Sequence, residues 1–151
     1  VYQWAWWYVK DGYVQFSYNG LINQWNVWWV IKDGKVDTEF NGFYSYWGTE
    51  LYAHDGYVDL GFKGLVQKGN TWVYVNNGKE DKSYTGAAVA TDGNSWYVKN
   101  GVIDTTYTGL YENKEGQWYF ENGKGVTGTR DMYGKIWYID HGKVKNVIVK
   151  G

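Results

Sequence analysis

The chain has 151 residues, and 15 Lys and Arg stand against 16 Asp and Glu, so the formal net charge is -1. A nucleic-acid partner requires a basic surface, and this balance argues against one. The absence of cysteine excludes disulfides and thiolate metal sites. No apolar run approaches the ~18 residues of a membrane span, so we expect no membrane insertion.

The composition favours short strands joined by tight turns. The chain holds 11 Trp, 16 Tyr and 21 Gly but no Pro. Aromatic residues are enriched in strands, and glycine is enriched in turns. In a helix, each glycine would cost about 1 kcal/mol relative to alanine. The fold class expected from composition is therefore all-β.

One motif recurs along the whole chain. An apolar and aromatic run ends in a polar residue and a glycine, as in WWYVKDG, WWVIKDG, ELYAHDG, WVYVNNG, SWYVKNG, QWYFENG and IWYIDHG. The seven turn glycines are Gly12, Gly34, Gly56, Gly78, Gly101, Gly123 and Gly142, at spacings of 22, 22, 22, 23, 22 and 19 residues. Such a period indicates a repeat array, so we interpret residues 1–151 as a single repeat domain, a fragment of a larger surface protein.

Each repeat is predicted to be a β-hairpin. Asp-Gly or Asn-Gly suits a type I′ turn, in which both central residues need a positive φ. The first hairpin should then pair Lys10 with Tyr13 and Val9 with Val14. Alternation along the strands predicts an apolar core face and an opposite face of charged residues and recurring tyrosines. The core faces of four hairpins comprise Trp7, Val9, Val14, Phe16 and Tyr18; Trp29, Ile31, Val36, Thr38 and Phe40; Leu51, Ala53, Val58, Leu60 and Phe62; and Trp96, Val98, Ile103, Thr105 and Tyr107.

The architecture expected from this pattern is a β-solenoid of about seven stacked hairpins with a ~22-residue repeat, since an isolated hairpin is marginal in water. The fourth repeat departs from it. Glu80 and Lys82 stand where apolar residues are expected. Either the register of this hairpin slips, or its second strand lies at an exposed edge.

The stretch GQWYFENGKGVTGT (residues 116–129) resembles the aromatic repeats of bacterial cell-wall-binding modules, both choline-binding and glucan-binding. The resemblance implies a secreted or cell-surface, cell-wall-associated bacterial protein. It also implies aromatic ligand sites between successive hairpins, which bind a cell-wall polymer or glycan. A second glycine closes most repeats of this chain: Gly20, Gly42, Gly64, Gly86, Gly109 and Gly128. Choline-binding repeats place Trp directly after this closing glycine. This chain has Leu21, Phe43, Leu65, Ala87, Leu110 and Thr129 there, which argues against choline because a cation cage needs several aromatic faces.

The tryptophans divide by their place in the repeat. Trp7, Trp29, Trp96, Trp118 and Trp137 precede the turn glycine by five residues and are predicted to lie in the core. Trp6, Trp28 and Trp72 lie one residue earlier, on the opposite face, while Trp4, Trp25 and Trp47 lie in the connectors, near Tyr44 and Tyr46. These eight residues are the candidate ligand-binding site, with Asn23, Gln24, Asn26, Asn41 and Glu50 as candidate polar rim groups. The alternative, that these rings pack on one another between hairpins, stays open.

No catalytic constellation is apparent. His54 and His141 flank hairpin turns and are expected to be exposed, and Asp37, Asp59, Asp81 and Asp104 are expected to be solvated carboxylates. We therefore expect no enzyme, no catalytic or metal-binding residue and no cofactor. The expected function is a non-catalytic module that binds a cell-wall polymer or glycan. The alternatives are an adhesin surface for a host or surface protein and a passive stalk.

Overall fold

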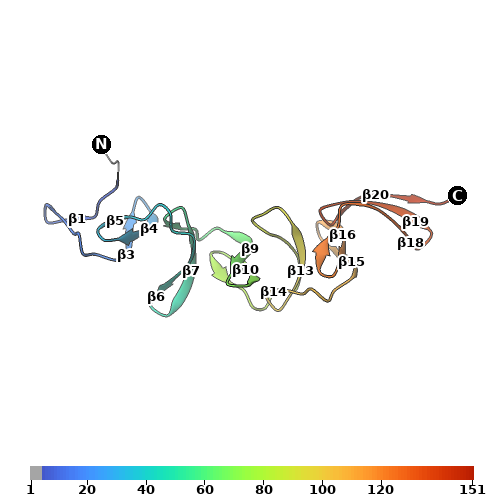
Figure 1. The fold of residues 1–151 in the computed structure, drawn as a ribbon, viewed down its shortest axis with the longest axis horizontal. Helices are drawn as coiled ribbons and strands as arrows, with labels where there is room; N and C mark the ends of the chain where they lie inside the picture. Colours follow the sequence, from blue (N-terminus) through green and yellow to red (C-terminus); the bar gives the residue numbers. More distant parts are fainter. Residues whose placement is uncertain (1–4) are drawn as a thin grey trace. The chain divides into compact units, whose positions relative to one another are not determined.

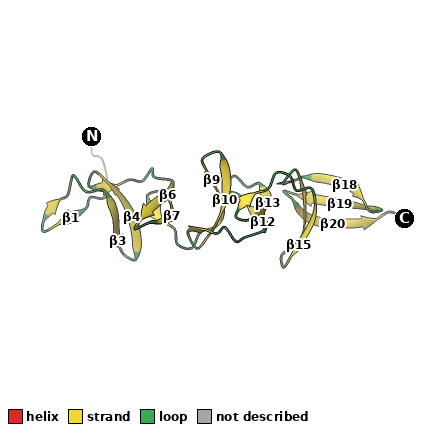
Figure 2. Ribbon diagram, turned by 90° about the horizontal axis from the view of Figure 1, so that it is seen from below, coloured by secondary structure: helices red, strands yellow, loops and turns green. Residues whose placement is uncertain are grey.

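The computed structural model describes residues 5–151, and this part of the chain consists of strands, turns and loops (Figures 1 and 2). Within it, no helix is long and apolar enough to cross a membrane. Internal contacts divide the chain into two compact units. The first contains residues 5–62 together with Asn77–Lys79, and the second contains Lys63–Asn76 together with Glu80–Gly151.

The first unit contains the strands β1 (Val9–Lys10), β2 (Tyr13–Val14), β3 (Gly20–Gln24), β4 (Val27–Lys32), β5 (Lys35–Val36), β6 (Gly42–Tyr46), β7 (Thr49–His54) and β8 (Tyr57–Val58). The strands that follow are β9 (Lys63–Lys68), β10 (Thr71–Asn76), β11 (Lys79–Glu80), β12 (Gly86–Val89), β13 (Ser95–Lys99), β14 (Val102–Ile103), β15 (Gly109–Asn113), β16 (Gly116–Glu121), β17 (Lys124–Gly125), β18 (Gly128–Met132), β19 (Lys135–Asp140) and β20 (Lys143–Val149).

The hairpin prediction is confirmed in its register. In the first repeat Val9 pairs with Val14 and Lys10 with Tyr13. The segments expected to be connectors, however, form a second and longer set of antiparallel hairpins: β3–β4, β6–β7, β9–β10, β12–β13, β15–β16 and β18–β19. From β4 onward each motif strand therefore pairs with a strand on both sides, whereas β1 pairs only with β2 within the described residues.

Successive repeats stack through their turn glycines. The Gly56 N–H donates to the Phe40 carbonyl, and the Val30 N–H donates to the Gly56 carbonyl. A Cβ at Gly56 would lie 2.6 Å from the Asp37 carbonyl oxygen, so only glycine fits. The same pair of backbone hydrogen bonds recurs at Gly34, Gly78, Gly101, Gly123 and Gly142. The glycine thus serves the turn and also the contact between repeats.

In the first six repeats the strand after the turn glycine has two residues and is shorter than the alternating pattern predicts, whereas β20, after Gly142, has seven. The Asp59 carboxylate accepts a hydrogen bond from the Gly61 N–H, an Asx turn that ends the strand after Val58. Asp37, Asp81 and Asp104 make the same turn. The residue after the aspartate is consequently exposed, so the assignment of Thr38, Leu60 and Thr105 to the core was wrong. Phe16, which follows Gln15, is exposed as well, and its assignment was also wrong. The aspartates have a structural role.

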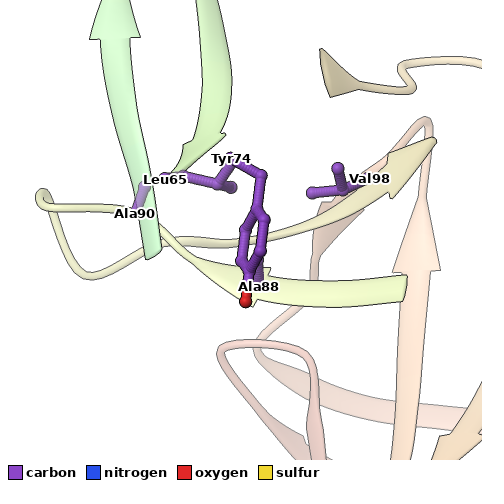
Figure 3. Close-up of a cluster of buried hydrophobic side chains, with 5 residues drawn as sticks. All are labelled: Leu65, Tyr74, Ala88, Ala90 and Val98. Atoms are coloured by element: carbon purple, nitrogen blue, oxygen red, sulfur yellow. The ribbon is translucent and has the colours of Figure 1, made fainter. Parts of the chain in front are cut away.

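The core draws on both faces of the motif strands. In the second unit, Leu65, Tyr74, Ala88, Ala90 and Val98 form one buried cluster (Figure 3). Tyr74 comes from the face expected to be polar, so that part of the prediction was wrong. Its ring stacks on Tyr84 with centroids 3.8 Å apart, and the Tyr84 hydroxyl donates to the Ala87 carbonyl. Burial raises the pKa of Tyr84 to about 12.

The five tryptophans assigned to the core differ in burial. Trp118 and Trp137 are buried, as predicted, and Trp29 and Trp96 are half-buried. Trp7 is exposed, so its assignment was wrong, and the reason is that β1 and β2 form a sheet of only two strands.

In the fourth repeat, Glu80 does not break the structure. It forms an ion pair with Lys68 on β9 and keeps a half-buried place in β11, whereas Lys82 lies in the exposed turn that follows.

Candidate functional site

The first unit contains an aromatic pocket between the first two repeats. Its volume is about 520 Å³. The residues that line it are Trp6, Trp7, Tyr8, Val9, Ile22, Gln24, Trp25, Trp29, Ile31 and Val36. None of these side chains carries a formal charge, and aromatic rings supply five of the ten. The pocket is therefore suited to an uncharged ligand with apolar faces.

Two candidate residues form a corner of this pocket. The rings of Trp6 and Trp25 lie 5.8 Å apart at an interplanar angle of 86°. Trp25 stands at the tip of the β3–β4 hairpin with φ 57°, followed by Asn26 with φ 62°. Both rings are about two-thirds exposed, at 68% and 69%. The corner therefore leaves aromatic surface open to a ligand.

A similar group occurs one repeat later. Trp47 is at the tip of the β6–β7 hairpin with φ 50°, and it is 90% exposed. Its ring meets the edge of Tyr46 at 6.3 Å, and Tyr46 lies 6.0 Å from Trp28. Trp28 packs against a core cluster of the first unit. Three candidate residues thus form a line of rings from the core to the tip.

The remaining candidates lie elsewhere. Tyr44 packs on Phe40 and on the core cluster of the first unit, and Trp72 packs against the core cluster of the second. Trp4 lies outside the described residues.

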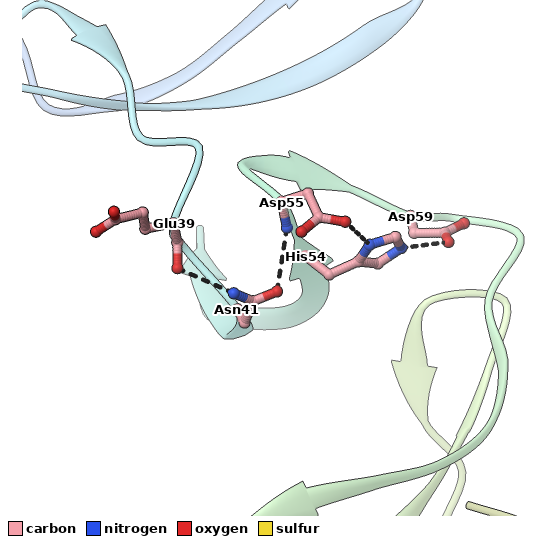
Figure 4. A network of polar contacts seen from close by, with 5 residues as sticks. All are labelled: Glu39, Asn41, His54, Asp55 and Asp59. Atoms are coloured by element: carbon pink, nitrogen blue, oxygen red, sulfur yellow. Dashed lines mark hydrogen bonds and ion pairs between the residues drawn. The ribbon is translucent and has the colours of Figure 1, made fainter. Parts of the chain in front are cut away.

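The predicted rim groups also divide. Gln24 lines the pocket, and Asn23 and Asn26 are exposed beside it on the β3–β4 hairpin. Asn41 is instead engaged in the scaffold: its amide donates to the Glu39 carbonyl at 3.0 Å and accepts from the Asp55 N–H at 3.1 Å (Figure 4). Equivalent caps are made by Asn19, Thr85, Thr108 and Thr127.

His54 is half-buried, and the expectation that it is exposed was wrong. Its ring nitrogens lie 3.2 Å from the Asp55 carboxylate and 2.8 Å from the Asp59 carboxylate (Figure 4). Burial lowers the pKa of His54, but the hydrogen bonds to Asp59 and Asp55 outweigh it and raise the pKa above 6.5. The ring also lies against Tyr57, with centroids 4.7 Å apart. This cluster contains no nucleophile, and it braces the third repeat.

Lysines accompany the repeating tryptophans, which the sequence reasoning missed. The Lys35 ammonium lies 5.8 Å from the ring centroid of Trp7, and Lys143 lies 4.7 Å from that of Trp118. Lys124 lies over Trp96 in the same way. Each of these lysines directly follows a turn glycine, so the repeat itself contained the signal.

A third aromatic tip was also missed. Tyr133 occupies the turn of the β18–β19 hairpin with φ 54° and is 79% exposed. The shorter last spacing of 19 residues hid its equivalence to Trp25 and Trp47.

The repeats have known relatives. The family model described as "Choline-binding repeat" matches residues 5–15, 17–37, 61–81, 83–104 and 106–125, which is more than half of the chain. The chain belongs to the choline-binding repeat family. The aromatic hairpin repeat inferred from the sequence is thereby confirmed. Among curated proteins, no relative matches the chain.

Several solved structures match the chain, and alternansucrase shares its fold. Alternansucrase in complex with isomaltononaose is 17% identical with a TM-score of 0.58, over 93% of this chain and 11% of the enzyme. Choline binding protein F from Streptococcus pneumoniae is 20% identical with a TM-score of 0.35, over 96% of this chain and 50% of that protein. CbpJ from the same organism is 23% identical with a TM-score of 0.32, over 85% and 42%. The chain thus spans at most half the length of these proteins.

Proposed function

We propose that this chain is a non-catalytic module of a bacterial surface or secreted protein that binds a neutral cell-wall polymer or glycan through aromatic sites. The pocket formed by Trp6, Trp7, Trp25 and Trp29 carries this proposal. Pyranose rings present C–H faces that stack on aromatic rings, while an amide such as Gln24 can bind hydroxyl groups. Membership of the choline-binding repeat family supports a binding role. The hairpin stacking within each unit supports a β-solenoid as the scaffold.

The electrostatics of the pocket favour a neutral sugar over choline. Trp7 is part of the pocket wall, and the Lys35 ammonium already lies 5.8 Å from its ring centroid. A quaternary ammonium would compete with this cation for the ring and would be repelled by it. Among the described residues, the pocket lining also contains no carboxylate that could offset the ligand's charge. A glycan meets neither obstacle.

An isomalto-oligosaccharide is a suitable first probe, because alternansucrase, which shares the fold, is solved in complex with isomaltononaose. We expect isomaltotriose to quench tryptophan fluorescence of the wild-type protein and Trp6→Ala to weaken its binding by about tenfold, the equivalent of about 1.4 kcal/mol. Trp6 is largely exposed, so the fold should survive this change.

Tyr13→Ala is the matched control, because Tyr13 is an exposed aromatic of the same repeat that does not line the pocket. It should bind like the wild type. Binding of choline chloride in place of sugar by a folded protein would contradict the proposal. Capture of a surface protein that Trp6→Ala leaves unchanged would instead favour the adhesin alternative.

A further inference from the structure

The tips of two successive hairpins hold tryptophan where the backbone disfavours it. Trp25-Asn26 and Trp47-Gly48 have positive φ at both turn positions, which are 57°, 62°, 50° and 78° in chain order. Bulky L-residues rarely adopt this conformation, which glycine, asparagine and aspartate accept readily. A later tip of the same chain uses glycine, with φ 62° at Gly69. The turn therefore does not require tryptophan.

Packing does not explain these tip residues either. Trp47 is 90% exposed, so its ring contributes little apolar burial to the folded state. Backbone strain that folding does not require is a feature of functional sites. Trp25 already belongs to the pocket, whereas Trp47 does not line it.

The two tips are built from the same positions of the repeat. Trp6 and Trp28 both precede their turn glycine by six residues. Trp6 contacts the tip residue Trp25, and Trp28 reaches Trp47 through Tyr46. In the third repeat, the position six residues before the turn glycine holds Glu50, and the tip that follows is Gly69-Asn70. The third repeat thus lacks both the inner ring and the tip ring, whereas the fourth keeps Trp72 at the inner position and has Asp92-Gly93 in the tip that follows.

We propose that Trp47, supported by Tyr46 and Trp28, is a second glycan subsite, separate from the pocket and repeated one hairpin later. This inference rests on the proposed function and adds to it a second point of contact for a linear, uncharged polysaccharide. Ser45 and Thr49 flank the tip with hydroxyl groups. One chain then holds two weak sites, and a polymer that occupies both gains avidity, which a short oligosaccharide does not.

Trp47→Asn in the full chain tests the subsite. The substitution creates Asn-Gly, the sequence most favoured in a type I′ turn, so the midpoint of thermal unfolding should stay the same or rise. Binding to a dextran surface should fall by about tenfold through loss of avidity. Trp47→Asn should bind isomaltotriose like the wild type, because the pocket, which Trp6→Ala weakens, does not contain Trp47.

Tyr133→Asn provides the control. Tyr133 has the same backbone conformation at its tip, but the residue six before its preceding turn glycine is Gln117, so the tip lacks the inner tryptophan. This variant should bind dextran like the wild type. Unchanged dextran binding by Trp47→Asn, or a lowered unfolding temperature with binding intact, would overturn the second subsite and leave the pocket standing. If the folded wild-type protein bound neither isomaltotriose nor dextran, the proposed function itself would be refuted.

Discussion

Trp25 and Trp47 each combine a strained backbone conformation with a side chain that is exposed to solvent. An L-residue in the left-handed region costs about 1–2 kcal/mol, and neither ring recovers this by deep burial. Asn41 shows the opposite case at the scale of a single residue. It satisfies one carbonyl and one N–H across two repeats, and its role is therefore to hold the scaffold together.

His54 gives the stability of the first unit a dependence on pH. Because Asp59 and Asp55 raise its folded pKa above 6.5, the protonated ring stabilises the native state. This contribution is complete below pH 6.5 and is lost as the pH rises through the folded pKa. We expect the free energy of unfolding, measured with urea, to fall across that interval.

In His54→Gln this component of the pH dependence should disappear, while Asp59→Asn, which keeps an acceptor for the Gly61 N–H, should reduce it. A wild-type stability that is flat or rises above pH 6.5 would contradict the assignment.

Within the repeat, two backbone features set the shape of the hairpin, the turn glycine at its turn and the Asx turn at the end of its second strand. The turn glycine admits the preceding repeat, and the Asx turn ends the second strand. The first was predicted from turn chemistry alone, but its stacking function depends on a segment about 20 residues away. The second explains why the alternating pattern failed beyond Val36, Val58 and Ile103.

The stacking role of the turn glycine can be separated from its φ requirement. Gly101→Ala places a Cβ 2.6 Å from the Asp81 carbonyl oxygen at φ +79°, so we expect a loss of about 2–4 kcal/mol from strain and clash together. Gly12 has a similar φ of +84°, and no atom of the described residues lies within 4 Å of a Cβ there, so Gly12→Ala should cost only about 1–2 kcal/mol. Urea denaturation measures both values, and equal losses would refute the stacking role.

At the scale of the whole molecule, the near-neutral charge and the uncharged pocket predict how binding responds to salt. Raising NaCl from about 50 mM to about 500 mM should change the affinity for dextran less than about twofold, because no ion pair to the ligand is screened. Titrations at both concentrations check this. A steep loss with salt would indicate an anionic wall polymer held by lysines.

Much of the fold could be predicted from the sequence because its determinants are local. The period, the turn glycines and the pairing of Val9 with Val14 follow from turn chemistry within a few residues. The core was harder to predict: Tyr74 is buried and Phe16 is exposed, because both depend on how neighbouring strands pack. The candidate site was predicted in part. The repeat pattern identified Trp6, Trp25, Trp28, Tyr46 and Trp47 as candidates. It did not distinguish them from Tyr44 and Trp72, which the structure places against core clusters.

The sequence by itself determined the all-β repeat and its ~22-residue period, because hairpin turns select glycine, asparagine and aspartate through their own backbone angles. Only the tertiary structure decided which tryptophans remain exposed. Burial depends on residues from adjacent repeats, such as Lys143 over Trp118, and on whether a turn or a strand follows. The tertiary structure also showed that Trp25 and Trp47, two tryptophans of the supposed connectors, stand at hairpin tips in the left-handed conformation, a property of the backbone that composition does not reveal.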